Sequence, residues 1–159
     1  MSTFDIVDRS RRRIVEATAA AAVLGGAPST ILAVATGGVE RGVAYAFDTT
    51  RRVGVLLPPF RPSLARGMAA HLVVSLVAGE ALARVVPRRR SVVWGAAAGL
   101  AMGVANVGVI GRRIPAIAEL PLWPQLADNV AFGVVFAIVA DRATRASSAS
   151  RVPAVAAWR

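Results

Sequence analysis

Seven polar side chains lie inside segments of this sequence that are otherwise apolar, and they are the residues best placed to do chemistry. They comprise hydroxyls, amides, one imidazole and one carboxylate: Ser29, Thr30, His71, Ser75, Asn106, Asp128 and Asn129. A polar or ionisable group is costly in hydrocarbon, so such residues usually face a bundle interior or a water-filled cavity. We take these seven residues as the candidate polar cluster.

The chemistry open to this cluster is the binding of a proton, a small solute or a lipid headgroup. Contact between Asp128 and His71 would create a pair that responds to pH, because imidazole titrates near neutrality. The alternative is purely structural. Polar side chains that hydrogen-bond across membrane helices stabilise the bundle by about 0.6 kcal/mol each. The structural or accessory role is our leading hypothesis, and a small transporter or solute-binding bundle is the alternative.

The residue types of this sequence give little support for an enzyme. The sequence has no cysteine and one histidine, which excludes thiolate chemistry and a multi-histidine metal site. It also lacks a G-x-S-x-G nucleophile turn, an H-E-x-x-H zinc motif and a phosphate-binding P-loop. We therefore expect no catalytic residue, metal or cofactor, and an enzyme is the least supported class.

Four apolar segments must position the cluster. Hydrophobic residues make up 55% of the chain and charged residues 18%, and a bilayer-spanning helix needs about 20 mostly apolar residues. The segments are 14–39, 67–86, 91–111 and 121–140. This pattern predicts an all-α integral membrane four-helix bundle over residues 14–140, multi-pass in the cell membrane.

The first of these segments is interrupted. It contains Gly25, Gly26 and Pro28, which predict one kinked span, with a shallow re-entrant pair as the alternative. Neighbouring helices or the hydroxyls of Ser29 and Thr30 must then pair with the freed backbone groups. The apolar stretch is longer than the roughly 7–15 residues of a secretory signal, so we do not expect its cleavage.

The remaining segments are predicted from their polarity. Residues 1–13 form a polar N-terminal arm, either a short helix or disordered, and residues 40–66 form an outer connection whose Val43, Tyr45 and Phe47 lie on the membrane surface. Residues 141–159 are rich in Arg, Ser and Ala and are expected to be a disordered tail.

Arginine positions predict the orientation of the bundle. All 19 basic residues are arginine, and with both termini cytoplasmic 12 of them flank the inner ends of the spans and 7 the outer ends. The net charge of +10 is therefore assigned to topology and to attraction by anionic lipids. We expect no nucleic-acid partner, since no soluble face is left to carry one.

In this topology the members of the polar cluster are expected at a similar depth in the membrane. At 1.5 Å per residue, its members lie roughly 6–12 Å below the outer surface, on all four spans. A lone carboxylate at that depth would be costly unless it were paired or protonated. We therefore predict that Asp128 and His71 are neighbours, directly or through one water.

Two further patterns concern helix packing. Glycines at four-residue spacing line one face of the third span, namely Gly95, Gly99 and Gly103, and let another helix approach closely. We favour a partner helix within the same chain, with a homo-oligomer as the alternative. Glu80 and Arg84 have the spacing and order of an ion pair on a helix, near the inner end of the second span.

Several short stretches of the four apolar segments, taken in their order along the chain, resemble those of a group of small four-span membrane proteins of actinobacteria. More loosely, the architecture is similar to that of the YagU-like inner-membrane proteins. The most specific stretch is Pro124-Gln125-Leu126-Ala127-Asp128-Asn129-Val130-Ala131-Phe132-Gly133, and the resemblance covers about residues 14–140. It implies a four-span fold and no particular activity. In that group a histidine often replaces Asn129 and an acidic residue Asn106, so a charged site is less expected here.

Overall fold

The computed structural model describes the backbone of residues 3–87 and 90–149 and the side chains of residues 11–87 and 90–143. Within that part the chain is helical and contains no strand. The helices are α1 (Thr3–Leu24), α2 (Ala27–Val53), α3 (Leu64–Val85), α4 (Ser91–Ala105), α5 (Pro115–Ala118) and α6 (Leu122–Ala149). A 3-10 turn, η1 (Gly54–Leu56), follows α2, and a π-helical segment, η2 (Asn106–Gly111), extends α4.

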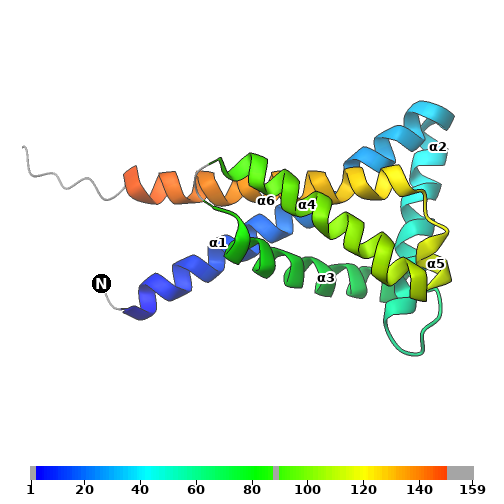
Figure 1. Ribbon diagram of the computed structural model, residues 1–159, viewed down its shortest axis with the longest axis horizontal. Coiled ribbons are helices and arrows are strands. Elements are labelled where there is room, and N and C mark those ends of the chain that lie inside the picture. Colours follow the sequence, from blue (N-terminus) through cyan, green and yellow to red (C-terminus); the bar gives the residue numbers. More distant parts are fainter. Residues whose placement is uncertain (1–2, 88–89, 150–159) are drawn as a thin grey trace, which may run out of the picture.

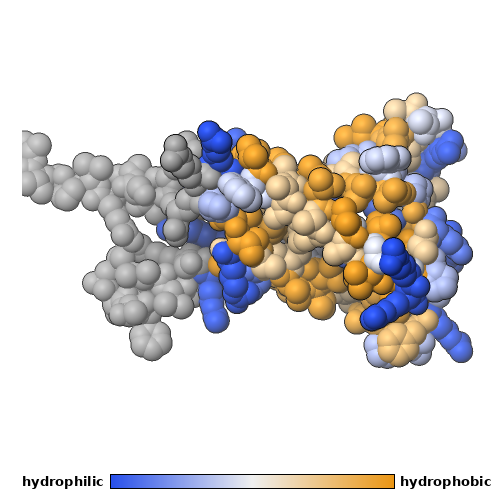
Figure 2. Space-filling view, viewed as in Figure 1, coloured by the Kyte–Doolittle hydropathy of each residue, from blue (hydrophilic) through white to orange (hydrophobic). Residues whose placement is uncertain are grey.

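Four helical segments are long and apolar enough to cross a membrane. Large apolar side chains on these helices point outwards, as at Val77 (66% exposed) and Val104 (57% exposed). Figure 2 shows apolar residues around the middle of the bundle and hydrophilic residues towards both ends. This distribution is that of a helical membrane protein, because lipid-facing side chains need no protein cover.

The interior of the bundle is built around α1 and α6. α6 packs against α4 and α1, α1 also packs against α3, and α2 packs against α3 and α6 (Figure 1). The buried core joins small residues of α1 to large ones of its neighbours: Ala17, Ala21, Leu82, Phe132 and Phe136. α1 thus lies between α3 and α6, which meet each other very little.

The first span is discontinuous. α1 ends at Leu24, two residues form a turn, and α2 begins at Ala27 and continues in the same general direction (Figure 1). Pro28 lies in the first turn of α2, where its missing N–H costs nothing. The interruption of the first span is therefore a two-residue turn between two helices, with Pro28 at the start of the second.

A second interruption lies at Gly38. Its φ of +80° and ψ of 176° are non-helical, and this region is accessible essentially to glycine alone. Beyond it α2 turns and runs across the end of the bundle (Figure 1). We call this end, formed by residues 38–63 and 111–121, the distal end.

The flanking segments are more helical than the polarity of the sequence alone indicated. Residues 40–53 belong to α2, so the predicted outer connection 40–66 is largely helical. The N-terminal arm is helical from Thr3, and α6 extends to Ala149, into the predicted disordered tail. Residues 150–159 of that tail, with Arg88 and Arg89, lie outside the described residues.

Candidate functional site

The N-terminus of α2 is capped by a side chain from another helix. Gly26, the residue before α2, has no side chain to cap it. Instead the backbone N–H of Ser29 donates to Asp128 Oδ1 of α6 at 2.9 Å. Ser29 is buried (5% exposed), so its amide could not find water there. A carboxylate oxygen also suits the positive end of the helix dipole. Asp128 therefore provides a hydrogen-bond acceptor for a backbone amide at the start of α2.

The C-terminus of α1 is covered from the opposite side by α3. His71 Nε2 lies 3.1 Å from the carbonyl oxygen of Ala22. A carbonyl can only accept a hydrogen bond, so this ring nitrogen must be the donor. Helices leave their last carbonyls without an internal partner. His71 thus pairs with one of the acceptors that the end of α1 exposes.

The two hydroxyls of the cluster also serve the helix break. Ser29 Oγ donates to the carbonyl oxygen of Gly26 at 3.2 Å, and Thr30 Oγ1 donates to the same oxygen at 3.0 Å. The amide of Gly25 in turn donates to the Ala21 carbonyl oxygen at 2.7 Å. The Gly26 carbonyl oxygen also accepts the Thr30 amide at 3.4 Å, so the two hydroxyls reinforce the first turn of α2, while the Ser29 amide and the Ala22 carbonyl are paired by neighbouring helices.

A row of side-chain amides joins α6 to the end of α4. Asn106 Nδ2 donates to Asn129 Oδ1 at 3.2 Å, and Asn129 Nδ2 donates to the Gln125 carbonyl oxygen at 2.8 Å. Gln125 Nε2 then donates to the Leu120 carbonyl oxygen at 3.0 Å. Asn106 is the residue at which α4 widens into the π-helix η2, so the amide row lies where the helix is irregular.

The predicted pair of Asp128 and His71 is not formed as a direct contact. Among the ion pairs and hydrogen bonds of the described residues, none joins these two side chains. Their helices, α6 and α3, are separated by α1, so the two residues reach the same helix break from opposite sides. Ser75, four residues after His71 on α3, is buried (3% exposed), whereas His71 is exposed.

The glycine face of α4 packs against α6. A Cβ atom at Gly99 would collide with the Asn129 carbonyl oxygen, and one at Gly95 would lie 2.9 Å from Ala137 Cβ. At Gly103 the nearest atom would be Leu126 Cδ2, at 3.0 Å. All three glycines are buried, so α6 of the same chain covers the face that a second copy would need.

The ion pair near the other end of α3 is also present. Arg84 Nη2 lies 2.6 Å from Glu80 Oε1, and both side chains are exposed. Exposed pairs of this kind stabilise a fold by about 1 kcal/mol at most. We assign it no functional role.

Sequence reasoning missed two polar features. Gln125 belongs to the amide row, and its spacing of four residues from Asn129 was the available signal. At the distal end Arg52 Nε lies 2.7 Å from Asp48 Oδ2, and Arg52 Nη1 lies 2.7 Å from Glu119 Oε2. These bonds tie the end of α2 to the connection between α5 and α6.

The fold and the site together define an α-helical, multi-pass membrane protein with a discontinuous first span. Comparison with known proteins does not narrow this class: no protein-family model, curated protein or solved structure matches the chain. Among the described residues, no group of three His, Cys, Asp or Glu could hold a metal ion. The arrangement of hydrogen bonds at the helix break is therefore the basis for assigning a function.

Proposed function

We propose that the protein is a structural or accessory component of the cell membrane, in which the polar cluster locks a discontinuous span. The observation that carries this proposal is the capping of both helix ends at the break. Asp128 accepts from the Ser29 amide at the start of α2, and His71 contacts the Ala22 carbonyl at the end of α1. The two functional groups expected to hold a ligand are thus engaged with backbone.

The energetics favour this role. A broken helix in lipid leaves N–H and C=O groups that cost several kcal/mol each if unpaired. Polar side chains from α3 and α6 can pair with them only if both helices hold fixed rotations about α1. The cluster therefore specifies how three helices pack, which is a structural task that needs no solute.

Substitutions of Asp128 test this proposal. Asparagine keeps an oxygen that can accept from the Ser29 amide, whereas leucine removes it. We expect Asp128→Leu to lower the free energy of unfolding by about 1–2 kcal/mol, near the upper range for polar contacts between membrane helices. Asp128→Asn should lose much less. The measurement is unfolding of the purified protein in mixed detergent micelles.

His71 provides the matched test on the other side of the break. His71→Gln can still donate to the Ala22 carbonyl, and His71→Leu cannot. The same order of stabilities is expected, with glutamine above leucine. Equal losses for the conservative and apolar variants, at both positions, would argue that charge or titration matters more than capping.

The alternative is a small transporter or a bundle that binds a solute or lipid headgroup. The broken span supports it, because half-helix ends within the membrane hold substrates and ions in secondary transporters. Asp128 would then act as a ligand-exchanging group. Thermal unfolding of the protein across a panel of metabolites and lipids distinguishes the two. A solute that stabilises wild type but not Asp128→Asn would favour transport.

The orientation belongs to the proposal as well. The excess of arginine at the ends nearer the two termini supports cytoplasmic termini. A reporter fused after Arg159 should therefore be active only if its enzyme works in the cytoplasm. Activity of a periplasmic reporter at that position would overturn the orientation, and would leave the capping argument untouched. Membership of the small four-span actinobacterial group remains part of the same proposal.

A further inference from the structure

The part of α2 beyond Gly38 has three distinct faces. One face, with Gly42, packs against protein and is buried. A second face carries the charged residues. The third is an exposed apolar row at four-residue spacing: Val39 (70% exposed), Val43 (50%) and Phe47 (56%). A helix with one apolar and one charged face lies in the plane of a membrane surface, and this segment runs across the end of the bundle (Figure 1).

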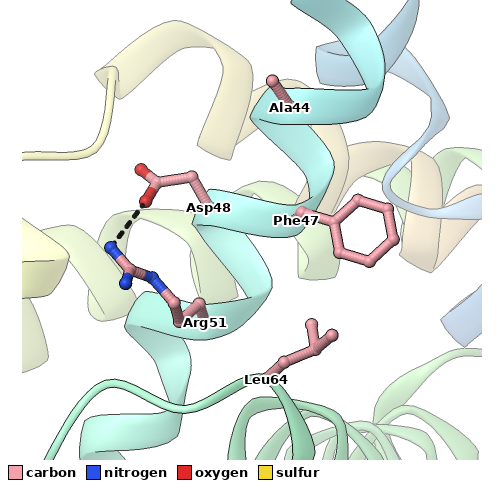
Figure 3. Close-up of a pocket in the computed structure, with 5 residues that line it drawn as sticks. All are labelled: Ala44, Phe47, Asp48, Arg51 and Leu64. Carbon is pink, nitrogen blue, oxygen red and sulfur yellow. Dashed lines mark ion pairs between the residues drawn. The ribbon is translucent and has the colours of Figure 1, made fainter.

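The apolar row of α2 continues onto the outside of α3. Phe47 and Leu64 line one recess at the corner between the two helices, together with Ala44, Asp48 and Arg51 (Figure 3). From Leu64 an exposed row follows α3 towards the middle of the bundle, through Met68, Leu72 and Leu76. The surface along α2 and the lipid-facing surface along α3 therefore form one continuous apolar strip.

The more exposed of the two arginines at this corner is Arg51. Arg52 engages Asp48 and Glu119 at 2.7 Å each, so it is committed to the protein. Arg51 lies 3.5 Å from Asp48, and its side chain is 61% exposed. In Figure 3 the Arg51–Asp48 pair and the Phe47 ring lie on opposite sides of α2. Both nevertheless line the same recess, so the corner joins an apolar wall to an exposed basic group that also pairs with Asp48.

The charge of the distal end has the sign that attracts phosphate. Residues 38–63 and 111–121 contain six arginines and three carboxylates. Phosphate binds arginine well because the guanidinium presents several donors in one plane. A ligand that combines an anionic phosphate with hydrocarbon matches both the basic corner and the apolar strip below it.

We propose that the corner between α2 and α3 binds an anionic membrane phospholipid, with its phosphate at Arg51 and an acyl chain along Phe47, Leu64 and Met68. The distal part of α2 then lies in the headgroup region of the bilayer. This inference goes beyond the proposed function. It requires only that the four helices span a membrane, so the variants of Asp128 and His71 do not test it.

The depth of α2 is tested first. The chain has no cysteine, so single cysteines at Val43, Arg41 and Leu72 can be labelled with a fluorophore without removing native thiols. In vesicles of phosphatidylglycerol and phosphatidylethanolamine, a nitroxide near the lipid headgroup should quench the Val43 label several-fold more than the Arg41 label. A nitroxide deep in the acyl chain should quench the Leu72 label most. Equal access of aqueous iodide to Val43 and Arg41 would overturn the in-plane helix.

Lipid binding is tested by native mass spectrometry of the full-length protein with phosphatidylglycerol. Arg51→Gln should reduce the bound fraction about fivefold, as expected for losing one arginine near an anionic headgroup. Phe47→Ser should also reduce it, with every charge retained. Arg112→Gln is the matched control, because Arg112 is an exposed arginine at the same end, and it should leave binding unchanged.

The alternatives give different results in the same experiment. Equal losses for Arg51→Gln and Arg112→Gln would indicate attraction by overall charge and would overturn a localised site. Displacement of the lipid by inorganic phosphate alone would indicate a free-anion site. Binding of phosphatidylcholine as strong as that of phosphatidylglycerol would remove the role given to Arg51. Circular dichroism of each variant establishes that the helices are retained.

Discussion

Replacing Gly99 by leucine is expected to destabilise the protein by about 3 kcal/mol or more, at the upper end of what overpacking costs. Even a Cβ atom at this position would collide with the Asn129 carbonyl oxygen and lie 3.0 Å from Val130 Cα. These are backbone atoms, which cannot move aside like the end of a flexible side chain. α4 and α6 would have to separate along their whole contact.

The same contact is tested from the other helix. A Cβ atom at Gly133 would collide with the carbonyl oxygen of Gly95 and lie 3.2 Å from Gly99 Cα. Gly133→Leu should therefore lose folded protein as Gly99→Leu does. The yield of folded protein by fluorescence-detected size exclusion, with unfolding in mixed micelles, gives the measurement.

Gly108→Ala is the control for these variants. No atom lies within 4 Å of a Cβ built at Gly108, so alanine should fit there without moving a neighbour. If Gly99→Leu stayed folded and only changed from a larger to a smaller oligomer, the glycine face would serve association between copies. Loss of the folded chain itself is the outcome that the packing on α6 predicts.

The four spans could be predicted because they depend on distance along the chain, and the depth assigned to the polar cluster stays a prediction. Apolar length locates a membrane helix, and 1.5 Å per residue converts position into depth. Contacts across the bundle depend also on helix rotation and on which helices are neighbours. Asp128 and His71 both reach the break between α1 and α2, yet α1 lies between their helices, so each pairs with backbone there.

The hydrogen-bond partners of the polar cluster explain why the site was harder to predict than the fold. Asp128 pairs with a backbone amide, and His71, Ser29 and Thr30 pair with backbone carbonyls. Every residue carries such groups, so side-chain types alone cannot reveal which ones are exposed. Gly25 and Gly26 marked the interruption, but the position of Pro28 within the first turn of a new helix became clear only from the structure.

The helix across the distal end was missed for a related reason. Gly37 and Gly38 end the apolar segment, and the residues that follow mix apolar and charged types without a simple two-sided pattern. The structure explains the mixture, since this part of α2 contacts protein on one face and leaves two unlike faces exposed. Three environments around one helix obscure the periodicity that a two-faced helix would show.

The bend at Gly38 predicts the second large effect. Gly38→Val is expected to cost about 3 kcal/mol, because a φ of +80° with ψ of 176° is strained for any residue with a Cβ. A β-branched side chain has the least freedom to adopt it. No atom lies within 4 Å of a Cβ built at this position, so the cost is one of backbone conformation and not of packing.

Gly37 is the matched control for Gly38. It precedes the bend and has no unusual φ, and the three atoms nearest to a Cβ there all belong to the flexible side chain of Arg41. Gly37→Ala should therefore change stability little, whereas Gly38→Ala should already lose about 1–3 kcal/mol. Unfolding of the two alanine variants in the same micelles compares adjacent glycines directly. Equal stabilities would mean that the chain can turn across the distal end without the left-handed residue.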